Sequence, residues 1–89
     1  MTVRAKFKVT KIGRQAQTIS NPHTGKWEEG EVQTLSLQPV YGNGDPTHEN
    51  TRFWNATPSG SIELNVVHKA AGEYFELGQE YYVDFIKAD

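Results

Sequence analysis

The sequence predicts a small, mostly β domain, a five-stranded antiparallel barrel or compact sandwich with one short helix and a projecting hairpin arm. Apolar and polar residues alternate in several stretches with the period of two that is typical of half-buried strands. Clusters of turn-forming residues separate these stretches, supplied by 8 glycines and 4 prolines. A chain of 89 residues can bury one small core, so residues 1–89 are expected to form a single domain.

The first expected strand covers residues 2–12. Its apolar residues at positions 3, 5, 7 and 9 alternate with basic residues at positions 4, 6 and 8. Ile12 breaks the alternation, which predicts a bulge or the end of the strand, and Gly13 fits either outcome. We interpret the basic face as protection of an exposed strand, with an anion-binding stripe as the alternative.

Residues 13–31 are expected to form a projecting hairpin arm or a long loop. The sequence NPHTG at positions 21–25 is a turn cluster between two polar segments. Trp27 lies among charged residues, so it either folds back over the end of the barrel or serves as a contact residue. We expect it to pack back, because an exposed tryptophan without a use is uncommon.

A second long strand is expected over residues 31–41. Pro39 cannot donate a hydrogen bond to a neighbouring strand, which predicts a sheet edge or a bulge at that end. The glycine-rich and polar residues 42–49 then form an exposed loop, and loops of this kind often carry contacts.

Residues 50–67 are expected to form a hairpin of two strands joined by the turn TPSG at positions 57–60. Phe53 and Trp54 would then be neighbours within a strand, and such neighbours face opposite sides of the sheet. We expect Trp54 to be buried and Phe53 to face outward, as a contact residue or as the cover of one end of the barrel.

A short helix is expected within residues 67–77, stopped by Gly78. The last strand, residues 79–87, carries apolar residues on both faces, which predicts an interior strand or a covered tail. The expected core consists of Val3, Ala5, Phe7, Val9, Leu35, Leu37, Ile62, Leu64, Val66, Phe75, Leu77, Val83 and Phe85.

Composition argues for a binding protein. The chain has 9 Lys+Arg against 11 Asp+Glu and no cysteine, which counts against a non-specific nucleic-acid binder and against thiolate metal sites. Its apolar runs are too short to span a membrane, and no secretory signal is recognisable. No catalytic, cofactor or metal signature is present, so we expect neither an enzyme nor a metal protein.

The candidate binding residues have aromatic or basic side chains, in several cases at adjacent positions. Exposed aromatics beside Arg and Lys can stack single-stranded bases, and the same residue types dominate hot spots on protein partners. The candidates are Arg52, Phe53, Trp27, Tyr41, His48 and Lys26. Self-association through a β edge beside Pro39 or through residues 13–31 is left open.

Three segments resemble small hypothetical proteins of tailed bacteriophages: VRAKF at positions 3–7, ATPSGSI at 56–62 and FELGQEYYVDF at 75–85. The last segment also resembles the helix-to-strand junction of OB-folds that bind single-stranded DNA. The first resemblance implies a phage origin, and the group has no assigned activity. Together with the balanced charge and the absence of a catalytic signature, it leads us to expect a non-enzymatic phage accessory protein that binds a phage structural or host protein, for example in capsid decoration or structural joining. The alternatives are an OB-like module for single-stranded nucleic acid and an early inhibitor of a host defence or enzyme. A virion or the host cytoplasm would be its location.

Overall fold

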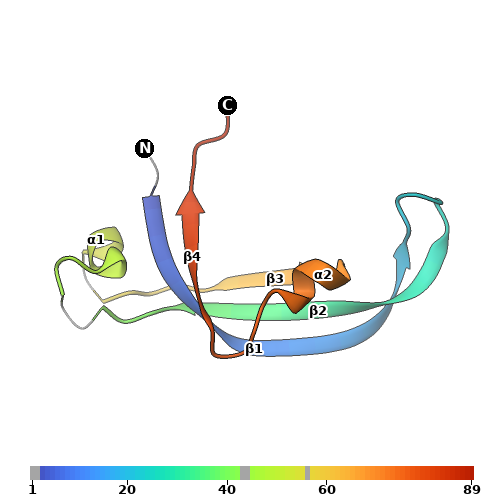
Figure 1. Cartoon of the computed structure of the whole chain (residues 1–89), viewed down its shortest axis with the longest axis horizontal. Helices are drawn as coiled ribbons and strands as arrows, with labels where there is room; N and C mark the ends of the chain where they lie inside the picture. The colour runs from blue at the N-terminus through green and yellow to red at the C-terminus, as the bar shows by residue number, and fades with distance from the viewer. Residues whose placement is uncertain (1–2, 43–44, 56) are drawn as a thin grey trace.

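The computed structural model describes residues 3–42, 45–55 and 57–89, and shows one antiparallel sheet of four strands with two short helices (Figure 1). The strand order is β3-β2-β1-β4. The elements are β1 (Val3–Ser20), β2 (Trp27–Pro39), α1 (Glu49–Trp54), β3 (Ile62–Val66), α2 (Lys69–Glu73) and β4 (Glu80–Phe85). The predicted small, mostly β fold is confirmed. The predicted closed five-stranded barrel is wrong, because β3 and β4 leave the sheet open at its two edges.

β1 and β2 form one long hairpin that reaches well beyond the other strands. They pair from Phe7–Pro39 as far as Ser20–Trp27, whereas β4 pairs only with β1 residues 3–8 and β3 only with β2 residues 33–37. Residues 13–31, called the arm below, are thus mostly a two-stranded ribbon. The molecule measures 51 × 32 × 18 Å with a radius of gyration of 16.3 Å, against roughly 12 Å for a compact chain of this length.

β1 contains a bulge between Val9 and Lys11, where its register with β2 shifts. A bulge adds one residue to one strand and bends it, and Figure 1 shows β1 turning sharply between its first and second halves. After the shift, Ile12 lies opposite Leu35 and packs against the core. The parity break at Ile12 therefore marked a bulge, and the strand continues to Ser20.

The core lies on one face of the sheet. Ala5, Phe7, Val9, Leu35 and Leu37 are buried there, and Ile62, Val66, Phe75 and Val83 pack against them half-buried. Four residues predicted for the core are exposed instead, because two short helices cannot cover the whole apolar face of an open sheet. They are Val3, Leu64, Leu77 and Phe85.

The expected strand at residues 50–54 is a helix, α1. The His48 Nδ1 accepts a hydrogen bond from the Asn50 N–H at the start of this helix, and Asn55 ends it in the left-handed conformation with φ 54°. In a helix, positions 50, 53 and 54 share one side. Phe53 and Trp54 thus both reach the sheet, and the predicted conflict between them disappears: Trp54 is half-buried and Phe53 more exposed.

The expected hairpin over residues 50–67 is wrong, because residues 57–60 form an irregular connection between helix α1 and strand β3. Ala56, and Asn43 and Gly44 of the expected 42–49 loop, lie outside the described residues. α2 falls within the predicted helical stretch, and Gly78 has a φ of +84° where its N–H donates to the Val9 carbonyl. β4 was expected inside the sheet or covered, but it is an edge strand.

Candidate binding surfaces

One end of the sheet displays an apolar cluster, called the sheet-end patch, formed by Val3, Phe53, Phe85 and Ile86. Val3 and Phe85 are cross-strand partners in β1 and β4, and the Phe53 and Phe85 ring centroids lie 6.0 Å apart. The exposed fractions of the four side chains range from 37% to 72%. A hollow of about 670 Å³ adjoins the patch and is lined by Val3, Asp84, Phe85, Ile86 and Lys87.

The rings of the patch are anchored to the core. The buried Phe7 ring lies 5.9 Å from Trp54, and Trp54 lies 4.3 Å from Phe53. The Trp54 indole N–H donates to the Ser59 carbonyl at 3.0 Å, which fixes the orientation of the indole. A continuous line of aromatic contacts therefore runs from the core to Phe85, and Phe53 needs little reordering to meet a partner.

The opposite face of β1 and β4 is charged but internally paired. Arg4 binds Asp84 through two hydrogen bonds of 2.6 and 3.0 Å, which hold the pKa of the Asp84 carboxyl below its ordinary value. Arg4 and Lys6 also lie over the Tyr82 ring, at 4.8 and 5.2 Å from its centroid. The Tyr82 hydroxyl donates to the Glu49 carboxylate at 2.9 Å; the Glu49 backbone N–H, and then this hydroxyl, lower the pKa of that carboxyl.

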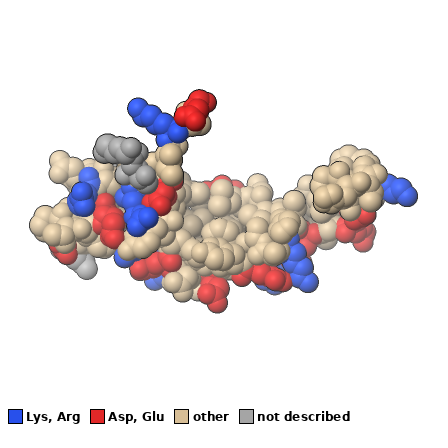
Figure 2. Space-filling view, turned by 45° about the horizontal axis from the view of Figure 1, so that its top comes forward, with Lys and Arg blue, Asp and Glu red and all other residues tan. Residues whose placement is uncertain are grey.

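Charge on this part of the surface is mixed in sign. Figure 2 shows acidic and basic side chains interspersed over the end of the molecule that carries α1. Lys6 lies 3.9 Å from the Glu80 carboxylate. This end of the molecule therefore offers little net attraction to a polyanion.

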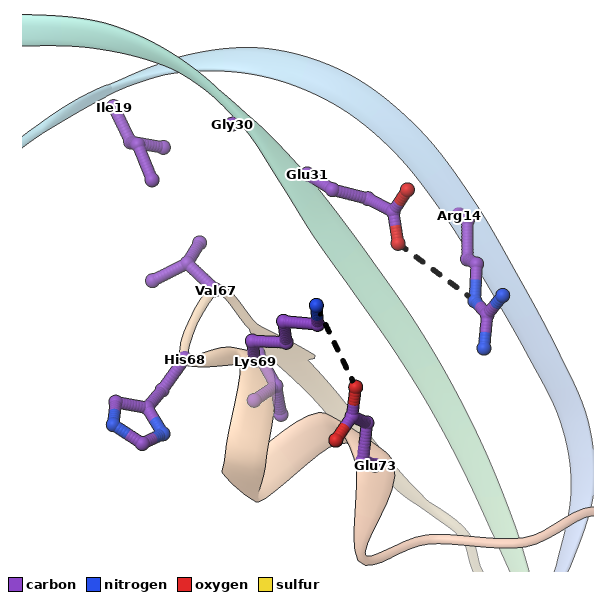
Figure 3. Close-up of a pocket in the computed structure, with 9 residues that line it drawn as sticks. Arg14, Ile19, Gly30, Glu31, Val67, His68, Lys69 and Glu73 are labelled. Carbon is purple, nitrogen blue, oxygen red and sulfur yellow. Dashed lines mark ion pairs between the residues drawn. The ribbon is translucent and has the colours of Figure 1, made fainter.

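A second hollow, called the arm groove, lies between the arm and α2 (Figure 3). Its volume is about 460 Å³. Two ion pairs stand on its two sides, Arg14–Glu31 at 3.7 Å in the arm and Lys69–Glu73 at 4.0 Å in α2. The groove is lined by Arg14, Ile19, Gly30, Glu31, Val66, Val67, His68, Lys69 and Glu73.

The structure divides the six predicted binding residues between two places. Lys26 and Trp27 lie at the far end of the arm, where Trp27 pairs with Ser20 and is 70% exposed. The expectation that Trp27 packs back over the domain is therefore wrong, because the arm is too long to return it to the core. The other four are Tyr41, His48, Arg52 and Phe53, which lie in or near α1.

These four residues differ in their exposure and in their contacts. Tyr41 is exposed just after β2, and Arg52 is exposed in the last turn of α1. His48 is half-buried, and its Nδ1 is occupied as the acceptor that caps α1. Phe53 alone joins an apolar cluster with neighbouring elements.

Sequence reasoning missed the partners of Phe53 in the patch. The alternation of apolar residues predicts core positions for Val3 and Phe85, and it predicts that Ile86 belongs to an interior strand or a covered tail. The signal was present in residues 79–87, since apolar residues on both faces of a strand also fit an edge strand with an exposed contact surface.

The described part of the chain contains no group of three or more His, Cys, Asp or Glu side chains placed to hold a metal ion. Within the same residues, neither helix has the length and apolar character needed to cross a bilayer. Comparison of the chain with protein-family models, curated proteins and solved structures found no match.

Proposed function

We propose that this chain is a non-enzymatic bacteriophage accessory protein that acts by binding another protein, in the first place a component of the virion. The observation that carries the proposal is the sheet-end patch, in which two phenylalanines, a valine and an isoleucine from three segments lie together on the surface. The phage origin is supported by the resemblance of positions 3–7, 56–62 and 75–85 to tailed-phage proteins.

The patch has the composition of the centre of a protein interface. Phe53 and Phe85 supply large, rigid apolar area, and the charged residues Asp84 and Lys87 line the hollow that adjoins them. An apolar centre with a polar rim is the usual arrangement of protein–protein interfaces. Exposed apolar clusters of this kind on a small domain commonly mark an interaction site.

A photo-cross-linking amino acid at position 53 tests the proposal in particles of the phage that encodes the chain. Benzoylphenylalanine in place of Phe53 should yield one specific adduct with a virion protein. The matched control carries the same amino acid at Tyr74, which is an exposed aromatic outside the patch. Absence of the chain from purified particles, or the same adducts from both positions, would contradict the proposal.

Binding of single-stranded nucleic acid is the second candidate, favoured by the Tyr82 ring beneath Arg4 and Lys6. An aromatic ring beside cations is a stacking platform for bases. The pairing of these cations with Asp84 and Glu80 opposes it. Fluorescence anisotropy of a labelled oligothymidine at low salt tests this candidate. Binding that is lost in Tyr82→Ala and retained in Tyr74→Ala supports it. The absence of binding rejects it.

A further inference from the structure

The outer edge of β2 in the arm is an open strand position. β3 pairs with β2 only as far as Gln33, opposite Val66, whereas β2 continues to Trp27. Among the described residues, β2 residues 27–32 pair with β1 on one side and with no strand on the other. An edge strand presents a row of backbone N–H and C=O groups that can pair with another chain. The position in line with β3 is therefore empty beside the arm.

This open edge faces a walled groove. The arm groove lies between β2 and the segment that turns away after β3, with Val66 and Val67 at one end and Lys69 and Glu73 of α2 along one side. Its volume of about 460 Å³ is large enough for several side chains. A strand added here would lie against side-chain walls and would meet the end of β3.

Because residue 30 is glycine, the Ile19 side chain of the neighbouring strand β1 reaches the groove. Ile19 belongs to β1, yet it lines the groove, because its side chain lies across β2 at Gly30. A Cβ at position 30 would stand 2.5 Å from the Ile19 Cδ1 and 2.9 Å from its Cγ1. A glycine within a strand often marks close approach of another group. Figure 3 shows Ile19 and Val67 at the same end of the hollow.

The charge along the open edge selects against a second copy of the same strand. β2 carries Glu28, Glu29 and Glu31 in this region. Two copies paired along this edge would bring these carboxylates close to one another, and like charges across strands are destabilising. Glu31 is paired with Arg14, and Glu28 accepts a hydrogen bond from the Asn21 side chain at 3.3 Å. Glu29, on the same face of β2 as Glu31, is left to attract a cationic side chain.

We propose that the arm groove binds an extended segment of a partner protein, which adds as a strand to β2 residues 27–32. The segment alternates apolar residues, which contact Ile19 and Val67 on one face, with Lys or Arg on the other face, where Glu29 stands. Six residues span about 20 Å in this conformation. Main-chain pairing supplies the affinity and the side chains supply the specificity, as in other cases of strand addition. The groove shares no residue with the sheet-end patch, so either surface can fail its test without the other.

A titration by nuclear magnetic resonance tests the proposal with a blocked peptide of alternating valine and lysine. We expect amide shifts confined to β2 residues 27–32 and to the segment around Val67, with methyl shifts at Ile19. Ile19→Ala should weaken binding roughly fivefold through lost apolar contact. Leu77→Ala is the matched control, since Leu77 is exposed and does not line the groove.

Two control peptides separate strand addition from charge attraction. The same peptide N-methylated at every second residue, in either phase, keeps its side chains and charges, and at least one phase should lose binding. A valine–glutamate peptide should bind more weakly than the valine–lysine peptide. Equal binding of both N-methylated forms and the parent, or no shifts at all, would overturn the proposal. Shifts of the same amides with protein concentration alone would overturn it in favour of a second copy.

Discussion

Asn50 pairs with the backbone of Lys6 as a neighbouring strand would. The Asn50 Oδ1 accepts a hydrogen bond from the Lys6 N–H at 2.6 Å, and the Asn50 Nδ2 donates to the Lys6 carbonyl at 2.8 Å. The ladder between β1 and β2 stops beside it at Pro39, which has no N–H to donate. The Val40 N–H still reaches the Lys6 carbonyl at 3.1 Å, so the fully buried Asn50 side chain supplies the acceptor that the Lys6 N–H lacks, which fastens α1 to the sheet.

Replacement of Asn50 by alanine is expected to lower the free energy of unfolding by about 2–4 kcal/mol, because the Lys6 N–H and the Val40 carbonyl lose their partner. The Lys6 carbonyl keeps only the Val40 N–H at 3.1 Å. Asn50→Asp should cost at least as much near neutral pH, since a carboxylate cannot donate to the two carbonyls. Urea unfolding followed by circular dichroism measures both. The control is Asn65→Ala on the exposed side of β3, expected to change stability by less than about 0.5 kcal/mol. Equal losses at positions 50 and 65 would refute the role of Asn50.

Gly72 and Gln33 are expected to be energetically coupled. The Gln33 amide donates to the Gly72 carbonyl at 3.1 Å, and a Cβ at position 72 would stand 2.5 Å from the Gln33 Oε1. Gly72→Ala gains helix propensity of about 1 kcal/mol but displaces this buried amide. The substitution should therefore be more favourable by about 1–2 kcal/mol in a Gln33→Ala background than in the natural one. A double-mutant cycle measures the difference, and additive effects would show that the contact is unimportant.

The two tryptophans are expected to give distinct fluorescence signals. Trp27→Phe leaves Trp54, which is half-buried and hydrogen-bonded to Ser59, so acrylamide should quench the emission weakly. Trp54→Phe leaves the exposed Trp27, whose emission should be red-shifted and readily quenched. Trp54→Ala should cost about 2–3 kcal/mol of stability and Trp27→Ala less than about 0.5 kcal/mol. Equal quenching of the two single-tryptophan proteins would disagree with the structure.

Asp84 should make stability depend on pH on the acid side. Because the Arg4 guanidinium lowers the pKa of the folded Asp84 below its model-compound value of 3.8, the pair stabilises the fold above that value. This stabilisation is lost as the pH falls through the lower folded pKa. Urea midpoints between about pH 7 and about pH 2 should therefore fall at the acid end, and less steeply in Asp84→Asn.

The partner substitution provides the control for this pH dependence. Arg4→Met should flatten the same acid limb, and adding Asp84→Asn to it should have little further effect, because each removes the same pair. High salt should reduce the contribution in the natural protein, since both side chains are exposed to solvent. An acid limb that is unchanged in both variants would exclude the pair as its source.

The arm is expected to open more readily than the rest of the sheet. A two-stranded ribbon without a covering layer is marginally stable, so amides in residues 17–20 and 27–30 should exchange hydrogen faster than those of Val9 and Leu35. Ala16 and Glu31 are cross-strand partners. An Asn-Gly turn between them in place of residues 17–30 should leave the free energy of unfolding within about 1 kcal/mol. Unfolding of this shortened chain would show that the arm supports the core.

Local sequence patterns predicted the strands better than they predicted helix α1. The alternation of apolar and polar residues in β1 and β3 predicts which side chains share a face, and the strand registers agree with that prediction. The aromatic pair Phe53–Trp54 favoured a strand by propensity, but α1 has only six residues, too few for a helical period to emerge. The residues that specify it are the cap His48 and the left-handed Asn55, together with the buried contact of Asn50, which depends on the distant Lys6.

Neither the open form of the sheet nor the exposure of the sheet-end patch could be predicted from the sequence, for one physical reason. Alternation identifies the apolar face of a strand, but it does not say whether another layer covers that face. Val3 and Phe85 have the period of core residues, and they are exposed because β4 forms an edge and α1 covers only part of this end. Ile19 reaches the arm groove only because residue 30, on the facing strand, is glycine.

The elongated outline has a consequence for stoichiometry. A compact domain of this size presents little more than one standard interface to its surroundings, whereas in this chain α1 and the tip of the arm lie at opposite ends of a molecule 51 Å long (Figure 1). Two partners could thus be held at once without excluding each other sterically. If both surfaces bind parts of one assembly, the second contact becomes intramolecular, so that two weak contacts act together as a strong one.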